Sequence, residues 1–124
     1  MRKRPGRTRR TGGQDMSKEC REAGDALTSV FALLGKRWSG VIIGVMLDNG
    51  AIRFAELHRA IPGISERMLS ERLTELAEAG LVQREVTPGP PLGVTYRLTG
   101  KGEGLRPALT ELLQWAEQHL AARA

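Results

Sequence analysis

Apolar residues recur at helical spacing between residues 54 and 80, and one interruption predicts two short helices joined by a tight turn. The first helix is expected over residues 54–60, with an apolar stripe formed by Phe54, Leu57 and Ile61. Pro62 and Gly63 end it, because proline cannot donate to the helical hydrogen-bond ladder and glycine accepts unusual dihedral angles. The stretch is therefore expected to form a helical hairpin.

The second helix is expected to begin at Ser65, whose side chain can cap the first free amides, and to stop at Gly80. Its inward face is apolar and consists of Leu69, Leu73, Leu76 and Ala77. Its outward face combines short hydrogen-bonding side chains with one forked cation: Glu66, Arg67, Ser70, Glu71 and Thr74. A helix that reads base edges in a DNA major groove needs such a face, whereas an ordinary helical hairpin has the same spacing and a solvated face.

Two strand-like stretches follow Gly80 and favour the DNA-binding interpretation. Residues 81–86 (LVQREV) and 94–98 (VTYRL) flank the turn-rich segment TPGPPLG, and alternate residues of the second stretch are apolar. Residues 51–53 are expected to add a short third strand. Two helices followed by such a hairpin form a winged helix, in which the second helix reads DNA and the hairpin lies along the DNA backbone.

Helical patterns precede this unit. From Met16 onward, helical spacing holds for Ala23, Ala26, Leu27, Val30, Phe31 and Leu34. Gly24 and Asp25 weaken the middle of this helix and mark a point where it can break. Residues 38–47 (WSGVIIGVML) are almost continuously apolar and predict a central buried helix, with a buried strand as the alternative.

A long amphipathic helix is expected after the hairpin, from about Gly100 to Leu120, with Thr99 as its cap and a kink near Pro107. Its apolar stripe consists of Leu105, Leu109, Leu112, Leu113, Ala116 and Leu120. A helix of about 20 residues is about 30 Å long, which one small domain cannot cover. The stripe therefore predicts a homodimer, and packing on the N-terminal helix is the alternative.

Charge is distributed unevenly along the chain. Six of the 19 basic residues and one of the 14 acids lie in residues 1–15, so residues 16–124 are neutral overall. The tail 1–15 is expected to be disordered and to serve either as a basic arm on DNA phosphates or only as a solvated extension. Residues 16–124 are expected to form one winged-helix DNA-binding and dimerisation domain.

Composition excludes several other classes. No apolar run reaches the roughly 18 residues of a membrane span, and no signal-peptide pattern is present. One cysteine fits a reducing cytoplasm rather than a disulfide framework. The chain has two histidines and none of the common hydrolase, phosphate-loop or paired-cysteine motifs, so no enzyme activity, metal or cofactor is expected.

Six motifs in order, LLGKRW, RFAEL, IPGIS, MLSERLTEL, GLV and YRLTGKG, resemble those of the HxlR-type transcription regulators, which are related to the MarR group. The resemblance covers residues 27–119. It implies an α+β, mainly α fold, a winged helix-turn-helix with added N- and C-terminal dimerisation helices. It further implies a dimeric DNA-binding regulator, and several members of the family sense oxidants or electrophiles through a cysteine near the N-terminus.

The expected DNA contacts fall into two groups. The residues expected to contact base edges or nearby phosphates are Ser65, Arg67, Ser70, Glu71 and Thr74. The residues expected to contact the DNA backbone are Lys36, Arg53, Arg84, Arg97 and Lys101. One departure from the family concerns the hairpin tip, where Leu92 stands after the paired prolines and many members have a basic residue.

Cys20 is the candidate effector site, for an oxidant or another thiol-reactive small molecule. Two neighbouring bases favour its thiolate and two acids oppose it. The family's sensing position falls on Gly24, one helical turn later, so Cys20 keeps the same helix face only if the helix is unbroken. A free thiol without a role is the alternative.

The chain is thus interpreted as a cytoplasmic, homodimeric regulator that binds operator DNA as a repressor and responds to oxidants or electrophiles through Cys20. Two alternatives stay open. The regulator can instead be controlled by a small apolar ligand at the dimer interface, or the winged helix can bind proteins and not DNA. Four acids against two bases on the second helix support the last interpretation.

Overall fold

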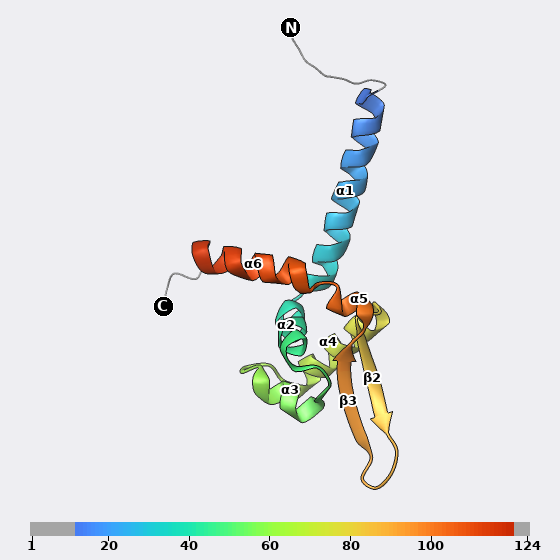
Figure 1. The fold of residues 1–124 in the computed structure, drawn as a ribbon, viewed down its shortest axis with the longest axis vertical. Helices are drawn as coiled ribbons and strands as arrows, with labels where there is room; N and C mark the ends of the chain where they lie inside the picture. The colour runs from blue at the N-terminus through green and yellow to red at the C-terminus, as the bar shows by residue number, and fades with distance from the viewer. Residues whose placement is uncertain (1–11, 121–124) are drawn as a thin grey trace. The chain divides into compact units, whose positions relative to one another are not determined.

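The computed structural model describes residues 12–120, and its helices and strands follow the predicted order (Figure 1). They are α1 (Gly12–Leu34), α2 (Ser39–Asn49), β1 (Ile52–Arg53), α3 (Phe54–Ala60), α4 (Glu66–Glu78), β2 (Val82–Thr87), β3 (Gly93–Leu98), α5 (Gly100–Glu103) and α6 (Arg106–His119). The chain divides into two compact units, one that holds α1 and ends at Lys36, and one that begins at Arg37 and holds all the other elements. The α+β, mainly helical fold class is confirmed.

The described part of the first unit contains one unbroken helix. α1 passes through Gly24 and Asp25 without a break and begins at Gly12, so it includes residues 12–15, which were expected to belong to the tail. The rest of that tail lies outside the described residues. The helix ends at Leu34, and the next amide, that of Gly35, donates to the Phe31 carbonyl at 2.8 Å. Leu27 and Phe31 are exposed on its surface.

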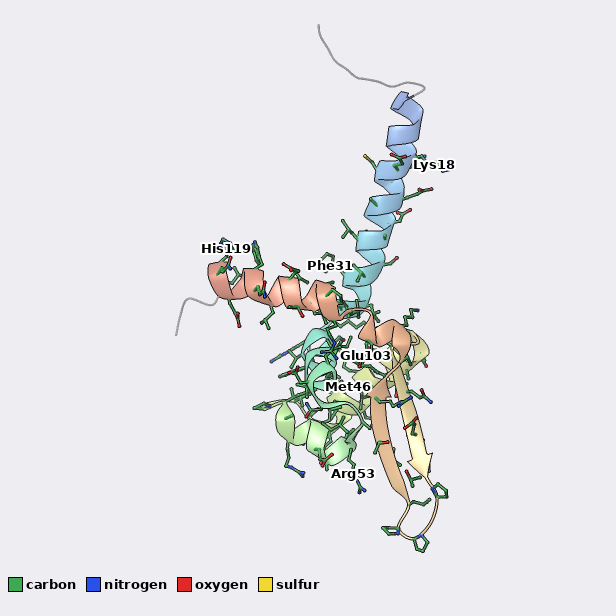
Figure 2. The ribbon with its side chains drawn as sticks, viewed as in Figure 1. Lys18, Phe31, Met46, Arg53, Glu103 and His119 are labelled. Carbon is green, nitrogen blue, oxygen red and sulfur yellow. The ribbon has the colours of Figure 1, made fainter. Side chains whose placement is uncertain are left out.

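The core of the second unit is aliphatic and centred on α2. Ile42, Ile43 and Met46 are fully buried, and Met46 is labelled in Figure 2. The helix interpretation of residues 38–47 is therefore correct, and the buried strand is excluded. The remaining core side chains come from every part of the winged helix: Ile52, Leu57, Ile61, Ile64, Leu69, Leu73, Leu76, Leu81, Val82 and Leu98.

The turn between α3 and α4 is closed by local hydrogen bonds. Ser65 caps α4 as predicted, because its hydroxyl oxygen accepts the Met68 amide at 3.0 Å. Gly63 has φ +93, which the chain needs to reverse direction there. His58 Nε2 lies 2.8 Å from the Ile64 carbonyl oxygen, so this histidine ties α3 to the turn and is not a simple surface residue.

The C-terminal end of α4 is defined equally sharply. Gly80 has φ +84 and donates to the Ala77 carbonyl at 3.0 Å, while the Leu81 amide donates to Leu76 at 2.9 Å. These two bonds satisfy the Ala77 and Leu76 carbonyls near the end of the helix, and the buried Leu76 and Leu81 belong to the same core. One inward assignment is wrong, since Ala77 is exposed, at the edge of the apolar stripe.

The three strands form an antiparallel sheet in the order β1–β3–β2. Ile52 pairs with Tyr96 and Val82 pairs with Leu98, which places the short strand beside the predicted hairpin. Leu81, Val82 and Leu98 are buried where the hairpin leaves the core. Beyond them β2 and β3 extend away from the helices as a wing (Figure 1).

The single helix expected from Gly100 to Leu120 is wrong, because the structure has two helices there. Thr99 caps α5, a single turn, since its hydroxyl accepts the Gly102 amide at 3.1 Å. Gly102 is packed against the Leu81 carbonyl and the Leu98 side chain, with no room for a Cβ. The chain then turns at Gly104 and Leu105, and α6 starts with Pro107 in its first turn, where no amide donor is needed.

In the described part of the chain, no single helix is both long and apolar enough to cross a membrane. Within the same residues, no group of three or more His, Cys, Asp or Glu side chains is placed to hold a metal ion.

Candidate nucleic-acid interface

The outer face of α4 presents polar side chains to solvent. Arg67 has 89% of its side chain exposed, against 48% for Glu71, and its Nε lies 3.4 Å from Glu71 Oε2. The Thr74 hydroxyl donates to the Ser70 carbonyl at 3.0 Å. An exposed ion pair contributes only about 0–1 kcal/mol, so Arg67 can exchange Glu71 for another acceptor at small cost. The structure thus brings Arg67, Ser70, Glu71 and Thr74 together on one exposed surface.

A groove of about 520 Å³ separates this face from the wing. It is lined by Ser70, Leu73, Thr74, Ala77, Glu78, Arg84 and Tyr96. Arg84 and Tyr96 are directly opposite each other on β2 and β3, so both side chains lie on the sheet face that continues the core. Tyr96 also contacts the ring of Phe54, with ring centroids 6.4 Å apart.

The two arginines assigned to the wing lie on opposite faces of the hairpin. Arg97 is opposite Gln83, one residue out of phase with Arg84, and successive strand residues alternate between faces. Its Nε lies 3.3 Å from Glu85 Oε2, on the face away from the groove. The structure therefore does not bring Arg84 and Arg97 together on one surface.

The remaining residues assigned to the DNA backbone are placed differently from one another. Arg53 is exposed at the start of α3, where its amide donates to Glu56 Oε1 at 3.0 Å. Lys101 Nζ donates to the Ala79 carbonyl at 2.9 Å, so this lysine closes the C-terminal end of α4. Lys36 is the last residue of the α1 unit. Of the backbone group, only Arg84 shares a groove with the outer face of α4.

Arg72 and Arg106, which were assigned no role from the sequence, each donate a hydrogen bond to a backbone carbonyl. Arg72 lies on α4 with only 14% of its side chain exposed, and its Nε donates to the Arg37 carbonyl at 3.0 Å. Arg106 Nη2 donates to the Leu47 carbonyl and to Glu103 Oε1, both at 2.9 Å. The sequence contains a signal for the first, because position 72 stands three residues after Leu69, at the spacing of the apolar stripe.

Cys20 is exposed on α1, and the helix around it is continuous. Cys20 and position 24 therefore lie on the same helix face one turn apart, as was expected for an unbroken helix. Cys20, Leu27 and Leu34 follow one another at intervals of seven residues, the spacing of a helix–helix contact stripe. The thiol thus stands in line with the apolar face of its helix.

α6 exposes most of its apolar stripe. No residue of this helix is buried. Leu112, Leu113 and Trp115, together with Leu120 just after its end, are each more than half exposed. Together with α2 it borders an apolar groove of about 530 Å³, whose α2 side includes Gly40, Val41 and Gly44. Large exposed apolar surfaces of this kind mark interaction sites.

Comparison with known proteins places the winged helix in a family. The HxlR-like helix-turn-helix model matches residues 33–124. The HTH-type transcriptional regulator YodB of Bacillus subtilis (strain 168) is 48% identical over 92 residues, which cover 74% of this chain and 81% of YodB. The solved reduced form of YodB from B. subtilis has a TM-score of 0.71 at 44% identity and covers 80% of this chain and 96% of its own.

Two further structures are similar over most of their length. The quinone-bound YodB from B. subtilis has a TM-score of 0.66 at 44% identity, with 76% of this chain and 98% of that chain covered. The redox regulator HypR in its reduced form has a TM-score of 0.72 at 34% identity, with 77% and 94% covered.

Proposed function

This chain belongs to the HxlR-like helix-turn-helix family of transcription regulators, and we propose that it is a homodimeric, sequence-specific DNA-binding repressor that responds to thiol-reactive compounds through Cys20. The observation that carries the DNA-binding part is the open polar face of α4 beside the wing. Its side chains are exposed, and the ion pair that holds Arg67 is weak.

Base reading is assigned to the middle of α4. Arg67 can donate two hydrogen bonds to a guanine edge, and the hydroxyls of Ser70 and Thr74 suit either base type. Glu71, beside Arg67, either orients that guanidinium or accepts from a cytosine amino group. Ser65 stands at the N-terminus of α4, where backbone amides attract a phosphate.

We expect the DNA backbone to bind in the groove between α4 and the wing. Arg84 provides the cation there, and the Tyr96 hydroxyl is a second donor from the facing strand. Arg53 at the start of α3 supplies a further cation outside the groove. Arg97 points away from the groove, so we assign it at most to a neighbouring DNA segment. Lys101 is assigned to the stability of α4 and not to phosphate.

A homodimer is supported by the exposed stripe of α6. Two copies that cover each other's apolar residues would remove Leu112, Leu113 and Trp115 from water. A two-fold dimer also has two α4 helices, one in each copy. They can enter successive major grooves on one face of the DNA if they are about 34 Å apart. The palindromic half-sites of the DNA would follow from this symmetry.

Control through Cys20 is supported by two observations. The thiol is exposed and in line with the apolar face of α1, so a modification there alters a surface suited to helix packing. YodB has been solved in a quinone-bound form, and HypR is described as a redox regulator. With one cysteine in the chain, a disulfide must join two copies or a small thiol.

A second candidate for the signal is a small apolar ligand in the groove between α2 and α6, since Val41, Leu109 and Leu113 line it. A role in protein binding without DNA is less well supported. Two of the four acids on α4, Glu71 and Glu75, are bound by arginines of the same helix.

The test is an in vitro selection of duplexes from a random library with the purified chain, followed by affinity measurements. We expect enrichment of a palindrome whose half-sites are about 10 base pairs apart, centre to centre. Failure to enrich any sequence, with a folded dimer in the assay, would contradict sequence-specific DNA binding and favour the protein-binding alternative.

A further inference from the structure

A side chain of α4 holds the segment that connects α1 to α2. Arg72 Nε donates to the Arg37 carbonyl at 3.0 Å, although the two residues are 35 positions apart. Its Nη1 also lies 3.2 Å from Glu75 Oε1, one turn further along α4. With 14% of its side chain exposed, against 89% for Arg67, Arg72 is well shielded from water. A shielded guanidinium with two partners keeps its geometry far better than an exposed one.

The next residue, Trp38, contacts Arg37 and the turn between α3 and α4. It has φ +81, and within the described residues no other non-glycine residue has a positive φ. Such a conformation persists only where the surroundings enforce it. The Arg37 guanidinium lies 4.8 Å from the centre of the indole ring, and the ring edge lies 3.6 Å from the position that a Cβ would occupy at Gly63. The indole thus rests on the turn between α3 and α4.

The junction is therefore attached to both parts of the helix-turn-helix. Arg37 is bound by α4 itself, and Trp38 packs on the turn that leads into α4. Residues 35 and 36 are the remaining links between α1 and this point. The chain that follows α1 is thus attached to the helix-turn-helix by a hydrogen-bonded carbonyl at Arg37 and a packed ring at Trp38.

We propose that Arg72 is the positioning residue that couples α1 to the DNA-reading helix α4. The coupling rests on the proposed function, because it is the route by which modification of Cys20 on α1 changes DNA affinity. Arg72 touches neither the DNA-facing surface nor the thiol. It sets the orientation of α4 relative to the junction, and that orientation decides how well α4 enters the major groove.

A competing route runs through the C-terminal helices. Thr99 Oγ1 donates to the Gly80 carbonyl at 2.6 Å and Lys101 Nζ donates to Ala79 at 2.9 Å, so α5 is tied to the end of α4. Arg106 at the start of α6 offers a matched control for Arg72. It also bonds one backbone carbonyl and one carboxylate three residues away, but neither partner belongs to α4.

The experiment compares wild type, Arg72→Gln and Arg106→Gln, each untreated and alkylated at its single cysteine with N-ethylmaleimide. Two quantities are measured: affinity for the duplex obtained by selection, and hydrogen exchange of the α4 amides, which needs no DNA. In wild type we expect alkylation to change the affinity by at least about fivefold, the lower end of typical coupling between sites, and to change α4 exchange. Arg106→Gln should respond in the same way.

Arg72→Gln should bind DNA when untreated and lose both responses to alkylation. A merely structural role would lower affinity in both states equally and leave their ratio unchanged, and that result overturns the proposal. An equal loss of response in Arg106→Gln assigns the coupling to the C-terminal route and also overturns it. Where Arg72→Gln does not fold, Arg72→Lys serves instead, with an intermediate ratio expected because an ammonium cannot bridge two planar partners.

Failure of the proposed function is recognised separately. If alkylation changes α4 exchange in wild type but not DNA affinity, and Arg72→Gln abolishes that change, the coupling stands and the DNA-based function is wrong. If neither quantity responds in wild type, both ideas are refuted.

Discussion

Lys101 Nζ donates to the carbonyl oxygen of Ala79 at 2.9 Å, so a lysine of α5 closes the last turn of α4. A cation at this end also interacts favourably with the negative end of the helix dipole. A basic residue of the YRLTGKG motif, assigned to the DNA backbone from the sequence, therefore has a hydrogen-bond partner within the protein.

Lys101→Met should lower the free energy of unfolding by about 1 kcal/mol, since it removes one exposed, charged hydrogen bond. Thermal denaturation measures this. The slope of log affinity against log salt concentration should stay unchanged. A slope smaller by about 0.9 would instead show that Lys101 neutralises a phosphate.

Arg67→Ala should weaken binding to the selected duplex by about 1–3 kcal/mol, because a bidentate contact to a base edge is lost. Affinity for a shuffled duplex of the same length should change far less. Fluorescence anisotropy on the two duplexes provides the comparison. Equal losses on both would identify Arg67 as a phosphate contact.

Arg84 and Arg97 should behave differently, because they lie on opposite faces of the hairpin. Arg84→Gln should reduce the salt slope of DNA binding by about 0.9, as expected for one phosphate contact. Arg97→Gln carries the same change in charge and is its matched control, with a smaller effect. Identical slopes for the two variants would contradict the assignment of the DNA backbone to the groove beside α4.

Leu113→Asp should dissociate the dimer, since it places a charge in the exposed apolar stripe of α6. Light scattering at micromolar concentration should give about twice 13.6 kDa for wild type and about 13.6 kDa for the variant. Gln114→Asp, on the polar side of the same helix, should remain dimeric. A wild-type monomer with intact helicity would rule out the two-half-site model.

Cys20→Ser should abolish the response to diamide or a quinone without changing affinity in the untreated state, because serine keeps the size of the side chain and removes the thiol. Wild type should lose affinity for the selected duplex after treatment. Dithiothreitol should restore it after oxidation by diamide. A variant that still responds would show that the signal acts at a site other than Cys20. The apolar groove between α2 and α6 would then become the leading candidate.

The helix-turn-helix could be predicted closely because its boundaries depend on neighbouring residues. Ser65 caps an amide three residues away, and Gly80 and Leu81 bond carbonyls three and five residues back. Such interactions are encoded in short stretches of sequence. The bounds expected for α3 agree with the structure for the same reason, since Pro62 and Gly63 leave little freedom after Ile61.

Strand register decided which wing residues share a surface with α4. The sequence identifies Arg84 and Arg97 as the basic residues of two strands, and it assigns both to the DNA backbone. Only the pairing of Arg84 with Tyr96 shows that one arginine faces the groove and the other does not. Alternation within each strand was predictable, whereas its phase relative to α4 depends on how the sheet meets the core.

The sequence by itself determined the order of the elements, the limits of the central helices, the aliphatic core and the exposed polar face of α4, because these follow from periodicity, capping and turn chemistry over a few residues. Only the tertiary structure decided that the last helix breaks, that Lys101 binds the end of α4 and that Arg72 holds the junction at Arg37. Each of these joins residues about 20 to 35 positions apart: Gly102 and Leu81, Lys101 and Ala79, Arg72 and Arg37. Such contacts form only once the chain has closed its loops around a common core, so no local sequence pattern can predict them.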